Sequence, residues 1–274
     1  MADKLNELIE TIKNISQTEY YKIKILDETP DIFDSKIGGL PYWVEGKDYP
    51  KDKAGKNLFL LAQINFDKEE TSSPLPTKGL LQFFIADDDI MGVNYDDQIT
   101  QTNFRVIYHE TIDYAITAES IENQGIPSSE KAEIYPVTGQ FKITLTKTRG
   151  YTTINDIKFE NIFKQAYEEV YGTKLNSKKK YYDILKPEEV DKLEDGLNSD
   201  SKSAYHKMLG YAFFTQEDPR YVKKYENYDT LLFQLDSESK YTIWGDLGIA
   251  NFFIQKKDLE EKNFSNVLYN WDCS

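Results

Sequence analysis

The feature that most constrains the fold is a pair of apolar stretches that occurs twice in the chain. Residues 60–66 read Leu-Leu-Ala-Gln-Ile-Asn-Phe, and residues 79–85 read Gly-Leu-Leu-Gln-Phe-Phe-Ile. The pattern returns as Leu-Leu-Phe-Gln-Leu-Asp at 231–236 and Gly-Ile-Ala-Asn-Phe-Phe-Ile at 248–254. Two long copies are too few for a solenoid, which needs several short repeats. The sequence therefore predicts an α+β fold in which two similar, mainly antiparallel sheet units share one core about a pseudo-two-fold axis.

Each copy alternates in the way expected of strands with one buried face. Burial of one Leu or Phe side chain contributes roughly 1.5–3 kcal/mol, so the wholly apolar face is predicted to point inward. The predicted inner residues are Leu60, Ala62, Ile64 and Phe66 in the first copy and Leu231, Phe233 and Leu235 in the second. The predicted outer residues are Leu61, Gln63, Asn65 and Asp67, and Leu232, Gln234 and Asp236.

The similarity between the copies extends beyond the strands, since residues 35–43 align with residues 206–214. Neither copy alone offers enough apolar surface for an independent core, so one domain over residues 1–274 is expected. Its predicted parts are repeat 1 at about 35–108, an insertion at about 109–205 and repeat 2 at about 206–272.

Two amphipathic helices are predicted to flank the sheet units. Residues 3 to about 18 and residues 154–171 both carry apolar side chains at the helical period. Thr153 is expected to cap the second helix, and Gly172 is expected to end it. The polar residues 173–203 are expected to form a mobile surface connector, in which Pro-Glu-Glu at 187–189 is expected to be the first turn of a short helix.

Seven motifs carry a resemblance to a known family. Besides residues 60–66 and 79–85, they are Ser-Lys-Ile-Gly-Gly-Leu-Pro-Tyr at 35–42, Leu-Gly-Tyr at 209–211, Thr-Gln-Glu-Asp-Pro-Arg at 215–220, Trp-Gly-Asp at 244–246 and Val-Leu-Tyr-Asn-Trp-Asp-Cys at 267–273. With these motifs the chain resembles the YwqG-like family of bacterial proteins, a domain of unknown function, over most of its length. The resemblance implies the fold and a bacterial origin, and it supplies no catalytic residues.

Composition and charge exclude several classes of protein. A formal net charge of −14 would repel a phosphate backbone, so no nucleic-acid partner is expected. No stretch approaches the roughly 20 apolar residues of a membrane span, and the N-terminus lacks the features of a signal peptide. The single cysteine, Cys273, cannot form an internal disulfide. These observations predict a cytoplasmic protein without a membrane partner.

Few residues of the chain suit catalysis or metal binding. The only histidines are His109 and His206, and they do not occupy matching positions in the two copies. A structural zinc site needs about four Cys or His ligands at close spacing, and none exists here. Cys273 is the penultimate residue, where the geometry of a nucleophile is hard to maintain. No cofactor is expected, and the sequence leaves open whether the protein is an enzyme.

Side-chain amides recur at matching strand positions and are the main candidates for a ligand site. An unpaired buried amide costs on the order of 1–3 kcal/mol, so these groups are solvated, bonded to one another or reserved for a ligand. A hydrogen-bonded structural ladder is one alternative, and a cluster that binds a polar small molecule is the other. The candidate residues are Gln63, Asn65, Gln82, Gln234, Asp236 and Asn251, with Trp244 and Asp246 at the rim.

The acidic residues support two further interpretations. The segment 87–97 offers oxygen ligands for a divalent ion, but it lacks the spacing of a known calcium loop, so an exposed loop without an ion is favoured. The function predicted is a non-enzymatic cytoplasmic protein that binds another protein or a small polar ligand, and an immunity protein is one version. The alternative is a hydrolase that uses Asp236, Asp246 or Asp272, with or without a divalent metal.

Overall fold

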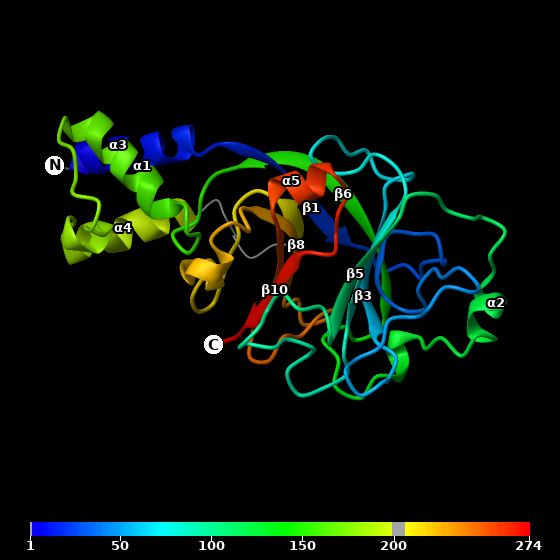
Figure 1. Ribbon diagram of the computed structural model, residues 1–274. Coiled ribbons are helices and arrows are strands. Elements are labelled where there is room, and N and C mark those ends of the chain that lie inside the picture. Colours follow the sequence, from blue (N-terminus) through cyan, green and yellow to red (C-terminus); the bar gives the residue numbers. More distant parts are fainter. Residues whose placement is uncertain (1, 199–205) are drawn as a thin grey trace.

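The computed structural model describes residues 2–198 and 206–274, and its main element is one ten-stranded sheet (Figure 1). Within those residues the strand order is β10-β9-β8-β7-β1-β6-β2-β3-β4-β5, and neighbouring strands are antiparallel. The strands are β1 (Thr18–Ile25), β2 (Lys36–Gly38), β3 (Phe59–Asn65), β4 (Leu80–Ile85), β5 (Phe104–His109), β6 (Gln140–Gly150), β7 (Lys207–Leu209), β8 (Thr230–Asp236), β9 (Ile249–Ile254) and β10 (Val267–Asp272). The α-helices are α1 (Ala2–Ile15), α2 (Ala118–Glu122), α3 (Phe159–Tyr171), α4 (Pro187–Asn198) and α5 (Lys256–Glu260).

The long antiparallel pair of β1 and β6 forms the centre of the sheet. Its register runs from Thr18 opposite Gly150 to Ile25 opposite Ile143. Strands β2 to β5 continue the sheet from β6, and strands β7 to β10 continue it from β1. We call these sets the N-half and the C-half. Strand β6 belongs to the segment expected to be an insertion, so that segment supplies one of the two central strands.

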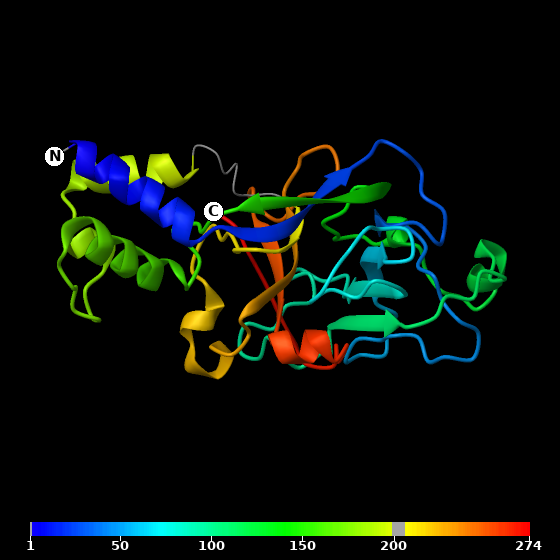
Figure 2. The ribbon, with the colours of Figure 1, turned by 90° about the horizontal axis from the view of Figure 1, so that it is seen from above.

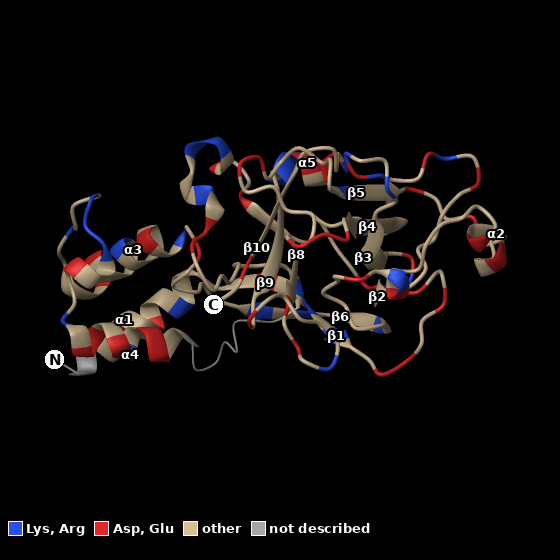
Figure 3. Cartoon of the chain, turned by 90° about the horizontal axis from the view of Figure 1, so that it is seen from below, with Lys and Arg blue, Asp and Glu red and all other residues tan. Residues whose placement is uncertain are grey.

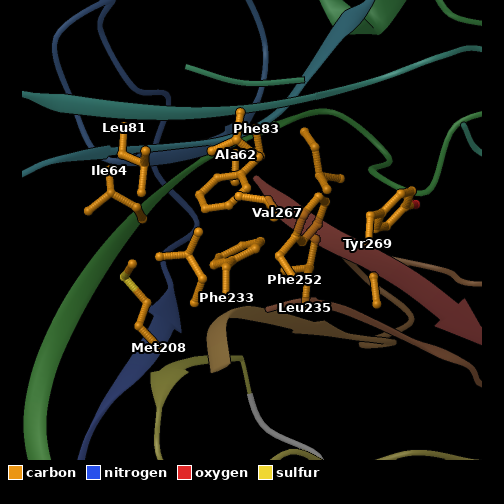
Figure 4. Packing of buried hydrophobic residues seen from close by; sticks show 14 of the residues in the cluster. Ala62, Ile64, Leu81, Phe83, Met208, Phe233, Leu235, Phe252, Val267 and Tyr269 are labelled. Atoms are coloured by element: carbon orange, nitrogen blue, oxygen red, sulfur yellow. The ribbon is translucent and has the colours of Figure 1, made fainter. Parts of the chain in front are cut away.

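The sheet curls so that the inner faces of the two halves meet in one core (Figures 2 and 4). The ring of Phe83 on β4 stacks against that of Phe233 on β8, with 4.7 Å between the ring centroids. Phe83 also contacts Phe252 on β9 edge to face, with 5.0 Å between the ring centroids. Aromatic pairs of this kind add about 0.5–1.5 kcal/mol each to the gain from burial, which helps to join the halves.

A β-bulge in β3 changes which leucine faces the core. The pairing of β3 with β4 shifts register between Leu60 and Ala62. Leu61 consequently lies in the inner core, and Leu60 joins a separate cluster on the outer face. A bulge adds one residue to one strand, so the residues before it point to the opposite face of the sheet from that expected. The predicted faces of Leu60 and Leu61 were therefore wrong.

Strand β8 has the same irregularity at the matching position. Its pairing with β9 shifts between Leu231 and Phe233, so Leu232 lies in the inner core and Leu231 lies in the outer cluster. The predicted faces of Leu231 and Leu232 were wrong for the same reason. The other predicted inner residues, Ala62, Ile64, Phe66, Phe233 and Leu235, lie in the inner core as expected.

Loops cover the outer face of each half. Strands such as β4 and β9 are therefore buried on both faces. Over the N-half, Trp43 and Ile121 pack on Phe84 of β4. Over the C-half, Phe214 and Tyr225 pack on Phe253 of β9. The outward-facing amides of these strands are therefore enclosed and must find hydrogen-bond partners within the protein.

The helices α1, α3 and α4 form a separate layer at one end of the molecule (Figure 1). Helix α1 confirms the predicted N-terminal helix, and Gly172 ends α3 with a left-handed φ of 68°. Helix α3 begins at Phe159, however, and Thr153 does not cap it. The Thr153 hydroxyl donates instead to the carbonyl oxygen of Ala212 at 2.8 Å, because this segment is held against the C-half.

The segment expected to be a polar connector contains the helix that was predicted to begin at Pro187, since α4 begins at that residue. Helix α4 buries Leu193 and Leu197 against the other helices, because these residues lie four positions apart on one helical face. Residues 199–203 of the predicted connector lie outside the described residues. None of the described helices is long and apolar enough to cross a membrane.

Candidate functional site

The predicted amides of the N-half are fully engaged by the protein. Gln63 is completely buried, and its Nε2 donates to the carbonyl oxygens of Ile32 and Asp34 at 2.9 and 3.0 Å. Its Oε1 accepts from the backbone N–H of Tyr42 at 3.1 Å and from Nε2 of Gln82 at 2.9 Å. Both donors and both acceptor positions of Gln63 are thus occupied.

Gln82 continues this network to a histidine. Its Nε2 also donates to the carbonyl oxygen of Tyr42 at 2.9 Å, and its Oε1 lies 2.9 Å from Nε2 of His109. An amide oxygen only accepts, so His109 carries its proton on Nε2. Burial, with a smaller effect from the charge of Lys47, lowers the pKa of His109 to about 4, so the ring is neutral at pH 7. Asn65 donates to the carbonyl oxygen of Phe33 at 2.6 Å.

The amides of the C-half also bond to the matching loop, but Oδ1 of Asn251 is buried without a hydrogen-bond partner among the described residues. Oε1 of Gln234 accepts from the backbone N–H of Phe213 at 2.9 Å, and Nδ2 of Asn251 donates to the carbonyl oxygen of the same residue at 2.9 Å. Each set bonds to the loop on its own half, and the core lies between the halves. These bonds favour the structural alternative, and a ligand role for the amides stays a prediction.

A buried ionic cluster joins the start of α3 to the C-half, and sequence reasoning missed it. Arg220 donates from Nη2 to Asp218 Oδ2 at 2.6 Å and to Asp156 Oδ2 at 3.0 Å, and all three residues are buried. The guanidinium carbon lies 4.1 Å from the centre of the Phe253 ring. Asp218 Oδ2 also accepts from the backbone N–H of Ile157 at 3.0 Å. With this many internal partners, the cluster is suited to positioning the chain.

Two lysines at matching positions of the halves are also buried. Lys36 Nζ donates to the carbonyl oxygens of Asp31 and Leu40 at 3.0 and 2.6 Å. Burial lowers the pKa of Lys36 to about 7, and it lowers the pKa of Lys207 to about 8. The alignment of residues 35–43 with residues 206–214 was the signal that pairs these lysines.

Other predicted residues meet at one end of the sheet, which we call the acidic end. It consists of residues 86–97, 132–138, 236–248 and 271–274, which adjoin the ends of β4, β8 and β10. Hydrogen bonds join the four segments. Asp87 Oδ1 accepts from the N–H of Ile134 at 2.7 Å, and the N–H of Ile243 donates to the carbonyl oxygen of Pro136 at 2.7 Å.

Charge at the acidic end is almost all of one sign (Figure 3). Its acidic residues are Asp87, Asp88, Asp89, Asp96, Asp97, Glu133, Asp236, Glu238, Asp246 and Asp272, and its one basic residue is Lys240. Lys240 forms an ion pair with Asp27 at 2.7 Å. The end thus carries a large part of the net negative charge of the chain.

Large apolar side chains are exposed on the same surface. Among the described residues, five of the nine exposed large apolar side chains belong to the acidic end: Ile90, Tyr95, Ile134, Ile243 and Leu247. Leu247 is 71% exposed and has a φ of 54°, a left-handed conformation that costs a non-glycine residue roughly 1–2 kcal/mol. Backbone strain and exposed apolar surface both concentrate at functional sites. The arrangement suits binding of a partner with an apolar centre and a basic rim.

A family model matches most of the residues that form this fold. The chain belongs to the family described as a domain of unknown function, DUF1963, whose model matches residues 35–273. The match includes both halves of the sheet and the acidic end. No curated protein matches the chain.

The remaining candidate site residues of this DUF1963 domain differ in how deeply they are buried. Trp244 is completely buried and packs near Trp271, with ring centroids 6.1 Å apart, so it is not at a surface rim as predicted. Asp246 is exposed, and Asp236 is half-buried. Asp272 accepts from the backbone N–H and the hydroxyl of Thr215, at 3.0 and 2.6 Å.

The carboxylates give no direct sign of a metal centre. In residues 2–198 and 206–274, no three Asp, Glu, His or Cys side chains are grouped as metal ligands would be. Burial raises the pKa of Asp236 to about 6 and also raises that of Asp272. The hydrolase alternative therefore stays a prediction. The exposed apolar residues escaped sequence reasoning because an apolar residue in a short loop looks the same whether it is buried or exposed.

Proposed function

We propose that this protein is a non-enzymatic binding protein that docks a basic protein partner on its acidic end. The observation that carries the proposal is the coincidence of Ile243, Leu247 and three other exposed apolar side chains with nine exposed or half-buried acidic residues on one surface. Protein interfaces typically combine an apolar centre with a polar rim. An acidic rim of this kind would also accelerate the encounter with a basic partner.

An immunity protein of the bacterial cytoplasm, which neutralises a basic toxin, is the version of this function that we favour. Its support is the net charge of −14 and the motif resemblance to the YwqG-like family. In that role the acidic end would cover a basic active surface of the toxin, as charge complementarity permits.

We further propose that the N-half and the C-half arose by duplication within one domain and are related by a pseudo-two-fold axis. The support is their strand order, which runs outward as β2-β3-β4-β5 from β6 and as β7-β8-β9-β10 from β1. Bulges at Leu61 and Leu232 and the amide bonds of Gln63 and Gln234 add to that support. Superposition of residues 35–108 on residues 206–269 in an experimental structure tests the proposal, and unrelated paths would refute it.

Site-specific photo-crosslinking in the native cell tests the docking surface. A benzophenone amino acid replaces Leu247 in one variant and Tyr182, which is 58% exposed on the helical layer, in the control. We expect a crosslinked protein of basic isoelectric point from position 247 and not from position 182. Crosslinking from both positions, or from neither, would contradict the proposal.

Charge reversal then tests the rim. The double variant Asp89→Lys/Asp246→Lys should reduce the crosslinking yield at position 247 by about tenfold, because like charges then face each other. The matched control is Glu168→Lys/Glu188→Lys, which makes the same change of charge on exposed residues of α3 and α4. An equal loss of crosslinking yield in both double variants would contradict the proposed rim, because only the net charge of the chain would then matter.

A further inference from the structure

A second site candidate lies at the opposite end of the strands. A cavity of about 690 Å³ opens where β1 begins at Thr18, β6 ends at Gly150 and β8 begins at Thr230. The acidic end adjoins the other end of β8, at Asp236. The cavity volume falls within the range of about 300–1,000 Å³ that is usual for small-molecule sites.

The charge that lines this cavity is opposite in sign to that of the whole chain. Four lining residues are basic, Lys147, Arg149, Lys158 and Lys256, and only Glu19 and Asp229 are acidic. A basic lining is unexpected in a chain of net charge −14. A cavity with one sign of charge focuses its field on a small ion of the other sign.

Lys147 and Arg149 already hold a carboxylate that belongs to the protein. The carboxylate of Glu19 on the neighbouring strand β1 lies 2.9 Å from Lys147 Nζ and 3.9 Å from Arg149 Nη2. The three side chains are 43–66% exposed, so a ligand can reach them. Exposed ion pairs contribute little to stability, so an incoming anion can displace Glu19 at little cost.

Lys158 supplies a further positive charge on the other side of the cavity. Its Nζ donates to the carbonyl oxygen of Asp229 at 2.7 Å, and among the described residues it forms no ion pair. Oδ1 of the Asp229 carboxylate accepts from the N–H of Lys256 and the hydroxyl of Thr230, both at 2.9 Å. Because Lys158 bonds to a neutral carbonyl group, its charge can still attract an anion.

A pair of hydroxyl groups adds a neutral donor to the cavity wall. The hydroxyls of Tyr21 and Ser72 lie 3.0 Å apart, and the Tyr21 oxygen accepts from the backbone N–H of Ser72 at 2.9 Å. Whichever hydroxyl donates in the bond between them, the hydrogen of the other stays free. Lys147 Nζ donates to the Ser72 oxygen at 3.4 Å, so the ammonium lies next to this pair of hydroxyls.

We propose that this cavity binds a small organic anion whose carboxylate or phosphate group replaces Glu19 between Lys147 and Arg149. Arginine and lysine are suited to both acid groups, and arginine can bind either through two parallel hydrogen bonds. The free hydroxyl of the Tyr21–Ser72 pair donates to the same acid group, and Lys158 attracts a second negative group. The site is independent of the proposed docking surface, which lies at the other end of the strands.

Isothermal titration calorimetry with defined probes tests the proposal on the full chain. The probes are citrate and succinate for carboxylates, and inorganic phosphate and glycerol 3-phosphate for phosphates. We expect saturable binding of at least one probe, and the class that binds identifies the acid group. Absence of binding by all four probes at millimolar concentration would overturn the proposal.

Three variants connect the binding to these residues. Lys147→Ala/Arg149→Ala should weaken binding at least tenfold, which corresponds to about 1.4 kcal/mol. The matched control, Lys178→Ala/Lys179→Ala, removes two exposed charges outside the cavity lining and should bind as the wild type does. An equal loss in the control would overturn the proposal.

Glu19→Gln gives a readout that misfolding cannot imitate. This variant removes the internal competitor, so we expect the probe to bind roughly threefold to tenfold more tightly. Unchanged or weaker binding by Glu19→Gln would show that the anion does not take the place of this carboxylate, and the proposal would fail.

Discussion

The acidic end and the cationic cavity lie at opposite ends of the same strands and have opposite chemistry. The acidic end has ten acidic residues, one lysine and five exposed apolar side chains. The cavity has four basic residues, two acidic residues and a pair of bonded hydroxyls. One surface suits a large partner with basic side chains, and the other suits a small anion. The comparison teaches that the local grouping of charge, rather than the net charge of −14, indicates what each region can bind.

Both regions are built from loops and strand ends that the sheet holds in place. At the cavity, residues 72–74 of the N-half and residues 229–231 of the C-half line the same space. At the acidic end, residues 86–97 meet residues 236–248 across the C-terminal segment, where Trp271 Nε1 donates to the carbonyl oxygen of Ile90 at 2.7 Å. In many proteins the binding residues lie on loops that a rigid scaffold holds in position. Changes that disturb one end and spare the other therefore test whether the two sites are separate.

The largest expected effect comes from Arg220→Ala. This change leaves Asp156 and Asp218 buried without their shared cation, so we expect a loss of about 3–5 kcal/mol in the free energy of unfolding. Denaturant titration measures the loss. Asp218 also binds the backbone next to Lys158, so anion binding at the cavity should weaken as well. Arg149→Ala is the control for an exposed ion pair, with an expected loss below about 1 kcal/mol. A similar loss in both variants would contradict the buried role of Arg220.

The next effect concerns the amides that hold each half to its loop. Gln63→Ala leaves the carbonyls of Ile32 and Asp34 without that partner, and we expect a loss of about 3 kcal/mol. Gln124→Ala, at an exposed position on the loop after α2, should cost less than about 0.5 kcal/mol. Thermal and denaturant unfolding give both values. If Gln63→Ala keeps its stability and loses a measured binding activity, the amide belongs to a site and not to the framework.

A pH titration sharpens the description of the acidic end. Burial raises the pKa of Asp236 from 3.8 to about 6, so the folded protein binds more protons than the unfolded chain between these values. Stability contributed by Asp236 is therefore greatest below pH 3.8 and is lost as the pH rises to about 6, by about 3 kcal/mol in total. Asp236→Asn should remove this part of the pH dependence in denaturant titrations between pH 4 and pH 7. If the free energy of unfolding changes with pH equally in the variant and the wild type, Asp236 does not titrate in this way.

The smallest expected effect separates stability from binding at the acidic end. Leu247→Gly relieves the left-handed strain of an exposed residue, and we expect a gain of about 0.5 kcal/mol in the free energy of unfolding. The same change removes an apolar contact, so partner binding should weaken. Ile243→Gly is the control, because its φ is not positive and it should lose stability. A loss of stability in Leu247→Gly would remove the strain argument for this surface.

Local patterns in the sequence predicted much of the architecture. Apolar periodicity located α1, the apolar stripe of α3 and the apolar strand pairs of both halves, since these signals arise from contacts within a few residues. The glycine at 172 ended its helix for the same local reason. Two details depended on distant partners. A bulge in the pairing of β3 with β4 reversed the face of Leu60, and the contacts of Thr153 and Asp156 with the C-half determined where α3 begins.

The candidate sites were predictable only in part. The acidic run 87–97 and Asp246 were visible as local composition, and the spacing of Lys147 and Arg149 on one strand face was a weak signal of a basic surface. Nothing local placed Lys158 across a cavity from these residues, or put Ile90 and Leu247 on one exposed surface.

The sequence by itself determined the strands, the principal helices and the excess of acid, because each depends on residues close together in the chain. Only the tertiary structure decided which charges and exposed apolar side chains share a surface. Those groupings depend on how the sheet curls and on contacts between residues more than 100 positions apart, such as the bond from Trp271 to Ile90.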